Sequence, residues 1–173
     1  METEGLIGRY AVSGAIAALK YLEPSVTRDL DILVALIPKS GLINLTPIFD
    51  YLRAQGLETH EGEGIVIGGW PVQFIPVSDD LDAEALAQAE ETEIDFPDDG
   101  SVRTRMLRPE HLVAIALRTD RPKDRARVAE FLESGVLDIP KFCGLLERFS
   151  LMYKWNTFCG SMQIPNPCRR PPT

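Results

Sequence analysis

Two aspartates separated by one residue, Asp29 and Asp31, have the side chains and the spacing best suited to chemistry. They lie in the most β-like run of the chain, residues 27–36, where apolar residues take every second position. Successive side chains of a strand point to opposite faces, so both carboxylates project from one face, with Cα atoms roughly 6.5–7 Å apart. This arrangement suits divalent cations that bridge the carboxylates to a triphosphate. We therefore predict Asp29 and Asp31 as ligands of Mg²⁺, or of Mn²⁺ as the alternative ion. The competing interpretation is two exposed acids near the end of an edge strand.

Ser13 and Gly14 form a second candidate element upstream of the aspartates. They end a short strand-like run, residues 9–13, and precede an alanine-rich helical stretch, residues 15–22. The first turn of a helix presents free backbone N–H groups, and glycine lets a phosphate approach the backbone closely. The pattern predicts a phosphate-binding turn, with an ordinary strand-to-helix turn as the alternative.

Basic residues form the third candidate element. Residues 103–127 contain eight Lys and Arg side chains against three acidic ones, whereas the whole chain has a net charge of −8. That overall charge argues against a general nucleic-acid coat protein, because phosphate binding needs massed basic residues. Within the cluster, Arg121 and Lys123 could counter the charge of a triphosphate. The alternatives are a solvated helix face and, around Asp124, a set of salt bridges within one helix.

The elements that must position these residues divide the chain into two parts. Residues 6–98 are predicted to form a small mixed β-sheet with helices packed on it, and residues 102–160 a helical region, which together make an α+β fold. The last residues, 161–173, are proline-rich and are expected to be a disordered tail. The other expected elements are a helix from Thr46 to Gly56, a hairpin of residues 65–67 and 72–77, an acidic helix over 82–92, and helices starting at Pro109, Asp120 and Pro140.

Three cysteines, Cys143, Cys159 and Cys168, are an odd number without metal-type spacing, so neither a disulfide framework nor a zinc site is expected. No apolar run is long enough to span a bilayer, and residues 1–10 lack the layout of a signal peptide. We expect a soluble, cytoplasmic protein without a membrane partner.

The order of strand, Ser-Gly turn, helix and Asp-x-Asp strand resembles the nucleotidyltransferase superfamily, which has the DNA polymerase beta-like fold. Thr27, two residues before Asp29, matches the Thr-x-Asp-x-Asp form that is common in bacterial members. The segments 69–76, 110–112 and 121–125 are also similar to a bacterial and archaeal subgroup related to the AbiEii-type nucleotidyltransferases of type IV toxin–antitoxin systems. The resemblance covers about residues 8–155.

The resemblance implies Mg²⁺-dependent transfer of a nucleoside monophosphate from an NTP to a hydroxyl of RNA, tRNA or a protein. It also implies that a cognate antitoxin or another protein could be a partner. Asp29, Asp31 and Lys123 would be the catalytic residues, with Asp124 beside Lys123 also matching a site position. The nucleotide would be bound by Ser13, Gly14, Thr27, Arg28, Gln73 and Arg121.

Two departures from the family pattern leave an alternative open. Many members have an arginine where this chain has Ser25, and Arg28 would have to substitute for it. Catalytic members have a third carboxylate where this chain has Gln73, whose amide cannot act as a base. Residues that could supply the missing charge from a loop are Glu63, Asp79 and Asp80. Otherwise the chain is a catalytically degenerate nucleotide-binding or protein-interaction module.

Overall fold

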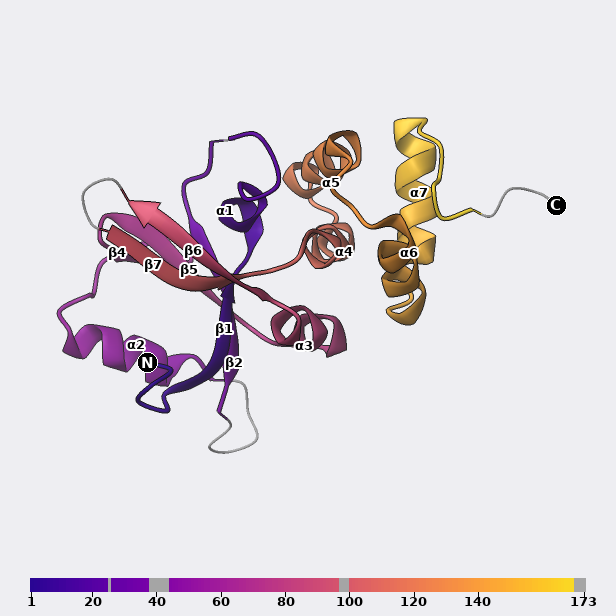
Figure 1. Ribbon diagram of the computed structural model, residues 1–173. Coiled ribbons are helices and arrows are strands. Elements are labelled where there is room, and N and C mark those ends of the chain that lie inside the picture. The colour runs from indigo at the N-terminus through magenta and orange to yellow at the C-terminus, as the bar shows by residue number, and fades with distance from the viewer. Residues whose placement is uncertain (25, 38–43, 97–99, 170–173) are drawn as a thin grey trace. The chain divides into compact units, whose positions relative to one another are not determined.

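The computed structural model describes residues 1–24, 26–37, 44–96 and 100–169 (Figure 1). The chain consists of two compact units, Met1–Arg108 and Pro109–Thr173. The first contains a mixed sheet with three helices, and the second is helical, which confirms the predicted α+β class.

The sheet of the first unit has seven strands in the order β3-β4-β5-β2-β1-β7-β6. β2 is central, antiparallel to β1 and parallel to β5, while β7 is parallel to β1 and antiparallel to β6. The strands are β1 (Ile7–Val12), β2 (Leu30–Leu36), β3 (His60–Glu61), β4 (Gly64–Ile67), β5 (Trp70–Pro76), β6 (Glu90–Phe96) and β7 (Gly100–Met106).

Helices cover both faces of the central strands, so β2 is apolar on both sides: Leu33 and Val34 are both buried. The helix α2 (Thr46–Ala54) packs Ile48 and Leu52 against Val34. The helix α3 (Asp80–Ala87) lies on the other side of β1 and β2 (Figure 1). The short helix α1 (Gly14–Ala18) directly follows β1.

Arg9 of β1 holds the end of α3. Its Nε donates to the carbonyl of Leu86 at 2.9 Å and its Nη2 to the carbonyl of Ala89 at 3.1 Å. The last carbonyls of a helix have no partner within the helix, so this guanidinium supplies donors that the helix itself cannot.

The structure confirms the predicted hairpin, which is formed by β4 and β5, and the predicted helix that begins at Thr46. The predicted strand over residues 27–36 begins only at Leu30. The predicted acidic helix over 82–92 is wrong at its end, because α3 stops at Ala87 and the chain enters β6 at Glu90. Cross-strand pairs such as Glu93 opposite Arg103 stabilise this acidic run as a strand.

The second unit contains α4 (Pro109–Thr119), α5 (Pro122–Ser134), α6 (Ile139–Arg148) and α7 (Met152–Met162). Its core is aromatic: Trp155 packs edge-on against Phe142, with ring centroids 5.1 Å apart, and is stacked on Phe158. Pro122 at the first position of α5 is suited to a helix start, because its missing N–H would be unpaired there anyway.

Three expectations about this part of the chain need correction. Residues 102–106 belong to β7, so the helices start at Pro109 and not at residue 102. Cys143 and Cys168 form a disulfide with Cα atoms 5.5 Å apart, which the cysteine spacing did not suggest. The residues expected to be a disordered tail include the end of α7 and a described segment that extends to Arg169. The disulfide ties this segment down, while residues 170–173 lie outside the described part.

In the described ranges no helix is both long and apolar enough to cross a membrane.

Candidate functional site

Asp31 lies directly against the turn that contains Ser13 and Gly14. The Ser13 N–H donates to the carbonyl of Asp31 at 2.8 Å, which continues the pairing of β1 with β2. A Cβ atom added to Gly14 would lie 2.0 Å from Asp31 Oδ2, and Gly14 has a φ of 61°. A side chain at residue 14 would therefore be strained and would also overlap the Asp31 carboxylate. The two predicted elements meet at the same place.

Asp29 comes just before β2 and is half-buried. The Thr27 hydroxyl donates to its carboxylate Oδ1 at 3.1 Å. This hydrogen bond ties the Asp29 side chain to its own segment and gives Thr27 a positioning role. Ser25, the other position of interest here, lies outside the described residues.

Gln73 is the register partner of Asp31 on the parallel strand β5. Its amide Nε2 donates to Glu63 Oε2 at 3.0 Å. Glu63 is exposed and lies in the turn that joins β3 to β4. The structure thus brings one of the three acids proposed to replace a third carboxylate into contact with the amide.

Asp79 and Asp80 do not join this group. The pairing of β2 with β5 runs from Leu30 opposite Val72 to Val34 opposite Pro76, so Asp31 and Gln73 lie at the beginning of both strands. Asp79 follows the far end of β5 and caps α3, where its side chain accepts a hydrogen bond from Asp82 N–H at 2.9 Å. These two acids are therefore excluded as partners of Gln73.

An open pocket of about 340 Å³ lies beside these residues. Arg28, which is exposed, lines it together with Asp29, Glu63 and Gln73. Two glycines near the β3–β4 turn and one proline of β5 form the rest of the wall, so its polar character comes from three carboxylates, one amide and one guanidinium. Besides those four residues, the lining consists of Glu61, Gly62, Gly64 and Pro71.

The carboxylates near this pocket can be compared with the ligands that Mg²⁺ prefers. In the described ranges no group of three or more His, Cys, Asp or Glu side chains is placed to hold a metal ion. Mg²⁺ prefers one or two carboxylates together with phosphate oxygens and water. Of the two predicted carboxylates, Asp29 lines the pocket, while the Asp31 carboxylate lies against the turn at Gly14.

Arg121 and Lys123 belong to the second unit, and their geometry is defined within that unit. Arg121 Nε donates to Asp124 Oδ2 at 2.6 Å, and Arg127 lies 3.9 Å from the same carboxylate. Asp124 is buried, whereas Lys123 is exposed. The salt bridges within one helix, considered above as an alternative, are therefore present around Asp124.

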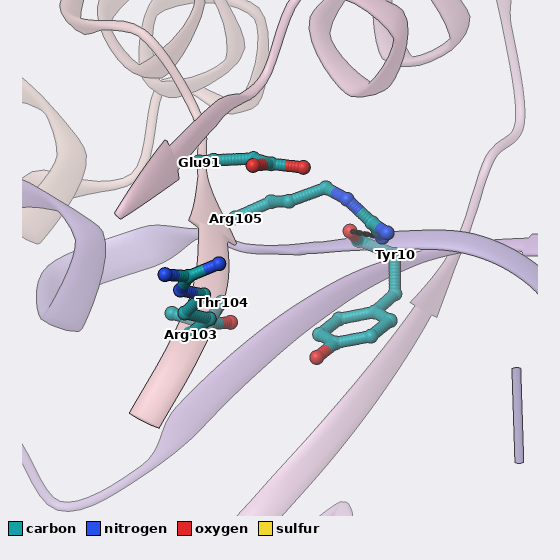
Figure 2. Close-up of a pocket in the computed structure, with 5 residues that line it drawn as sticks. All are labelled: Tyr10, Glu91, Arg103, Thr104 and Arg105. Carbon is teal, nitrogen blue, oxygen red and sulfur yellow. Dashed lines mark hydrogen bonds between the residues drawn. The ribbon is translucent and has the colours of Figure 1, made fainter. Parts of the chain in front are cut away.

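Figure 2 shows a second pocket, of about 200 Å³, on β1, β6 and β7 that the sequence did not suggest. Arg105 extends across Tyr10 there: its Nη1 donates to the Tyr10 carbonyl at 3.2 Å and its guanidinium lies 5.4 Å from the ring centroid. Arg105 also pairs with Glu2 at 3.1 Å. Because acids already compensate its arginines, this pocket is a poorer phosphate site than its composition suggests. No motif signals it, since its residues come from three separate strands.

Comparison of the chain with protein-family models and with curated protein sequences finds no match in either.

Proposed function

We propose that the chain is a Mg²⁺-dependent nucleotidyltransferase whose nucleotide site is the end of the sheet formed by the Ser13–Gly14 turn, Asp29, Asp31 and Gln73. The observation that carries this proposal is the contact between Asp31 and Gly14, with Gln73 in register beside Asp31. Asp31 and Gln73 lie on adjacent strands, and the Ser13–Gly14 turn ends the strand on the other side of Asp31. The sequence had suggested each of them as a nucleotide or metal ligand. Mn²⁺ is the alternative ion.

In this proposal Asp29 and Asp31 hold the metal ion, which when bound neutralises charge on the triphosphate. The Ser13 N–H donates to the Asp31 carbonyl, so the proposed phosphate contact of this turn falls to the Ser13 hydroxyl. Arg28 at the pocket wall supplies a positive charge, and Thr27 keeps Asp29 in place.

The reaction requires a proton acceptor that Gln73 cannot provide. The acceptor hydroxyl attacks the α-phosphorus, a new O–P bond forms, and the bond to pyrophosphate breaks. We assign the released proton to the Glu63 carboxylate, because it contacts Gln73 and lines the same pocket as Asp29. Arg121 and Lys123 belong to the second unit, so the proposal for the site on the sheet rests on residues of the first unit alone.

The acceptor is a hydroxyl of RNA, tRNA or a protein, and an antitoxin is the partner that the resemblance suggests. A cytoplasmic location belongs to the same proposal. The second candidate is a nucleotide-binding module without turnover, favoured by the amide that Gln73 presents beside Asp31, since an amide cannot act as a base.

The test compares the wild-type chain with the double variant Asp29→Asn/Asp31→Asn. Each protein is incubated with Mg²⁺ and labelled ATP, GTP, CTP or UTP in the presence of total RNA and protein acceptors. We expect labelled product and pyrophosphate release from the wild type only. Asp50→Asn is the matched control, because Asp50 is an exposed acid that pairs only locally with Arg53 on α2. Circular dichroism verifies that the folds are equal.

Equal labelling by the double variant and the wild type would overturn the proposal. Calorimetry separates the second candidate: Mg²⁺-dependent binding of one NTP to the wild type, its loss in the double variant, and no pyrophosphate release would identify a binding module. Absence of both binding and turnover in the wild type would reject both functions.

A further inference from the structure

The segment after α7, residues 163–169, is held by a disulfide and a few hydrogen bonds, without core burial. Gln163 has a left-handed conformation that ends α7, and the chain then runs back along that helix (Figure 1). None of the seven residues is buried, and four of them are exposed. Because apolar burial is the main source of stability, the packing that holds this segment is weak.

Asn166 provides most of the polar contacts of the segment. Its Oδ1 accepts from Trp155 Nε1 at 2.8 Å and from Cys168 N–H at 2.9 Å, and its Nδ2 donates to Asn156 Oδ1 at 2.7 Å. The Ile164 N–H donates to the Cys159 carbonyl at 3.1 Å. Trp155 itself is fully buried and contacts the rings of Phe142 and Phe158, so its main apolar contacts come from α6 and α7.

Cys168 is bonded to Cys143 of α6, at a sequence separation of 25 residues. Both cysteines are half-buried, and neither belongs to the buried core of the helices. The closed loop contains α7, which is anchored by its own aromatic core. The disulfide therefore adds a constraint mainly on the segment after the helix.

We propose that the Cys143–Cys168 disulfide is a reducible clasp: cleavage by a dithiol reductant releases residues 163–169 from α7 while the helices stay folded. A thiolate of the reductant attacks one sulfur and forms a mixed disulfide, and its second thiol displaces the remaining cysteine. Two electrons and two protons pass to Cys143 and Cys168, and the reductant becomes a disulfide. The Trp155 indole N–H then loses its partner on Asn166.

Cys159 serves as the internal control because it takes no part in the clasp. It is buried, and this burial raises the pKa of its thiol, which disfavours the reactive thiolate. The variant Cys159→Ser should therefore keep the disulfide and respond to reductant as the wild type does.

The experiment measures amide hydrogen exchange of the full chain, oxidised and after treatment with dithiothreitol. The reporters are the N–H groups of Ile164, Cys168 and Arg169, each of which donates a hydrogen bond, while residues 165 and 167 are prolines. We expect their exchange to rise by roughly tenfold or more on reduction, with little change in α4 to α7. In the double variant Cys143→Ser/Cys168→Ser, these N–H groups should exchange as fast as in the reduced wild type, and dithiothreitol should not change their exchange. In a Trp70→Phe background, the fluorescence of Trp155 should change on reduction.

Three results would overturn the clasp. Three free thiols in the air-oxidised protein would show that the disulfide does not form. Equal exchange of residues 163–169 before and after reduction would show that Asn166 holds the segment alone, which Asn166→Ala would then verify. Loss of protection throughout α4 to α7 would make the disulfide a general support of the fold instead of a local clasp.

Discussion

Asp31 and Gln73 lie opposite each other on the neighbouring parallel strands β2 and β5. A carboxylate at residue 73 would therefore stand beside Asp31, where it could share a metal ion or accept a proton. The chain instead has an amide at this position, and the amide contacts the exposed Glu63.

Replacing Gln73 by glutamate is expected to increase nucleotidyl transfer. The variant Gln73→Glu places a base next to Asp31, and a positioned general base contributes roughly 10²–10⁴-fold to a rate. We expect a rise of at least about tenfold in the initial rate of pyrophosphate release. Gln55→Glu is the control, because Gln55 is an exposed residue at the end of α2. An unchanged rate in Gln73→Glu would show that base strength at residue 73 does not limit the reaction.

Removing the charge of Glu63 tests its role as proton acceptor. Glu63→Gln should lower the wild-type rate by roughly 10²-fold, while nucleotide affinity changes little. Glu61→Gln is a matched control from the same pocket, because only Glu63 contacts Gln73. Equal effects of the two substitutions would indicate a general charge effect of the pocket.

Gly14→Ala should destabilise the first unit and disturb Asp31. The new Cβ would lie 2.0 Å from Asp31 Oδ2, in addition to the strain of a φ of 61°. Strain alone costs about 1–2 kcal/mol. Gly56→Ala measures the cost of backbone strain alone, since Gly56 has a φ of 79° and no atom lies within 4 Å of an added Cβ. Urea denaturation should give a greater loss of unfolding free energy for Gly14→Ala than for Gly56→Ala, together with loss of NTP binding. Similar losses for both would mean that Asp31 moves away without cost.

Asp124→Asn should weaken the second unit, because the buried Asp124 carboxylate accepts two hydrogen bonds from Arg121, at 2.6 and 3.2 Å. Hydrogen bonds to charged groups contribute about 1.5–3 kcal/mol, and we expect a loss of this order in the free energy of unfolding. Asp120→Asn is the comparison, since Asp120 is exposed and lies 3.6 Å from Arg125. It should cost less than about 1 kcal/mol. Equal costs would show that burial does not strengthen the Asp124 pair.

Asp138, which caps α6, predicts a specific response to acid. A hydrogen bond from the Lys141 side chain, followed by one from the Lys141 backbone N–H, lowers the pKa of the Asp138 carboxyl below its ordinary value of 3.8. A lowered pKa in the folded state stabilises the fold above pH 3.8, and this contribution is lost as the pH falls through the folded pKa. NMR titration should show a low pKa in the wild type and a pKa closer to 3.8 in Lys141→Ala. Lys123→Ala should leave the titration of Asp138 unchanged, and a similar shift there would point to net charge as the cause.

Local signals in the sequence sufficed for elements whose stability is local. Thr46 and Pro47 mark the start of α2, and the Gly68–Gly69 turn between two apolar runs marks the β4–β5 hairpin. Asp31 and the Ser13–Gly14 turn were selected from strand alternation and turn chemistry, and the structure places them in contact. Short-range rules work here because the backbone preference and the apolar pattern agree.

Features that depend on distant parts of the chain were not predictable in this way. β6 is acidic and polar, and it forms a strand because Arg103 and its neighbours on β7 pair with it. Cys143 and Cys168 meet only because α7 reverses the chain at Gln163. Glu63 could be named as one of three candidate acids, but only the parallel register of β2 and β5 separates it from Asp79 and Asp80.

The close approach of Gly14 to Asp31 also constrains the evolution of this chain. A side chain at residue 14 and a carboxylate at residue 31 compete for the same volume, so the two positions cannot vary independently. A homologue that acquires alanine or a larger residue at position 14 must shorten the side chain at position 31 or shift the strand. Substitutions at positions 14 and 31 should therefore be correlated among homologues, because both residues form this contact.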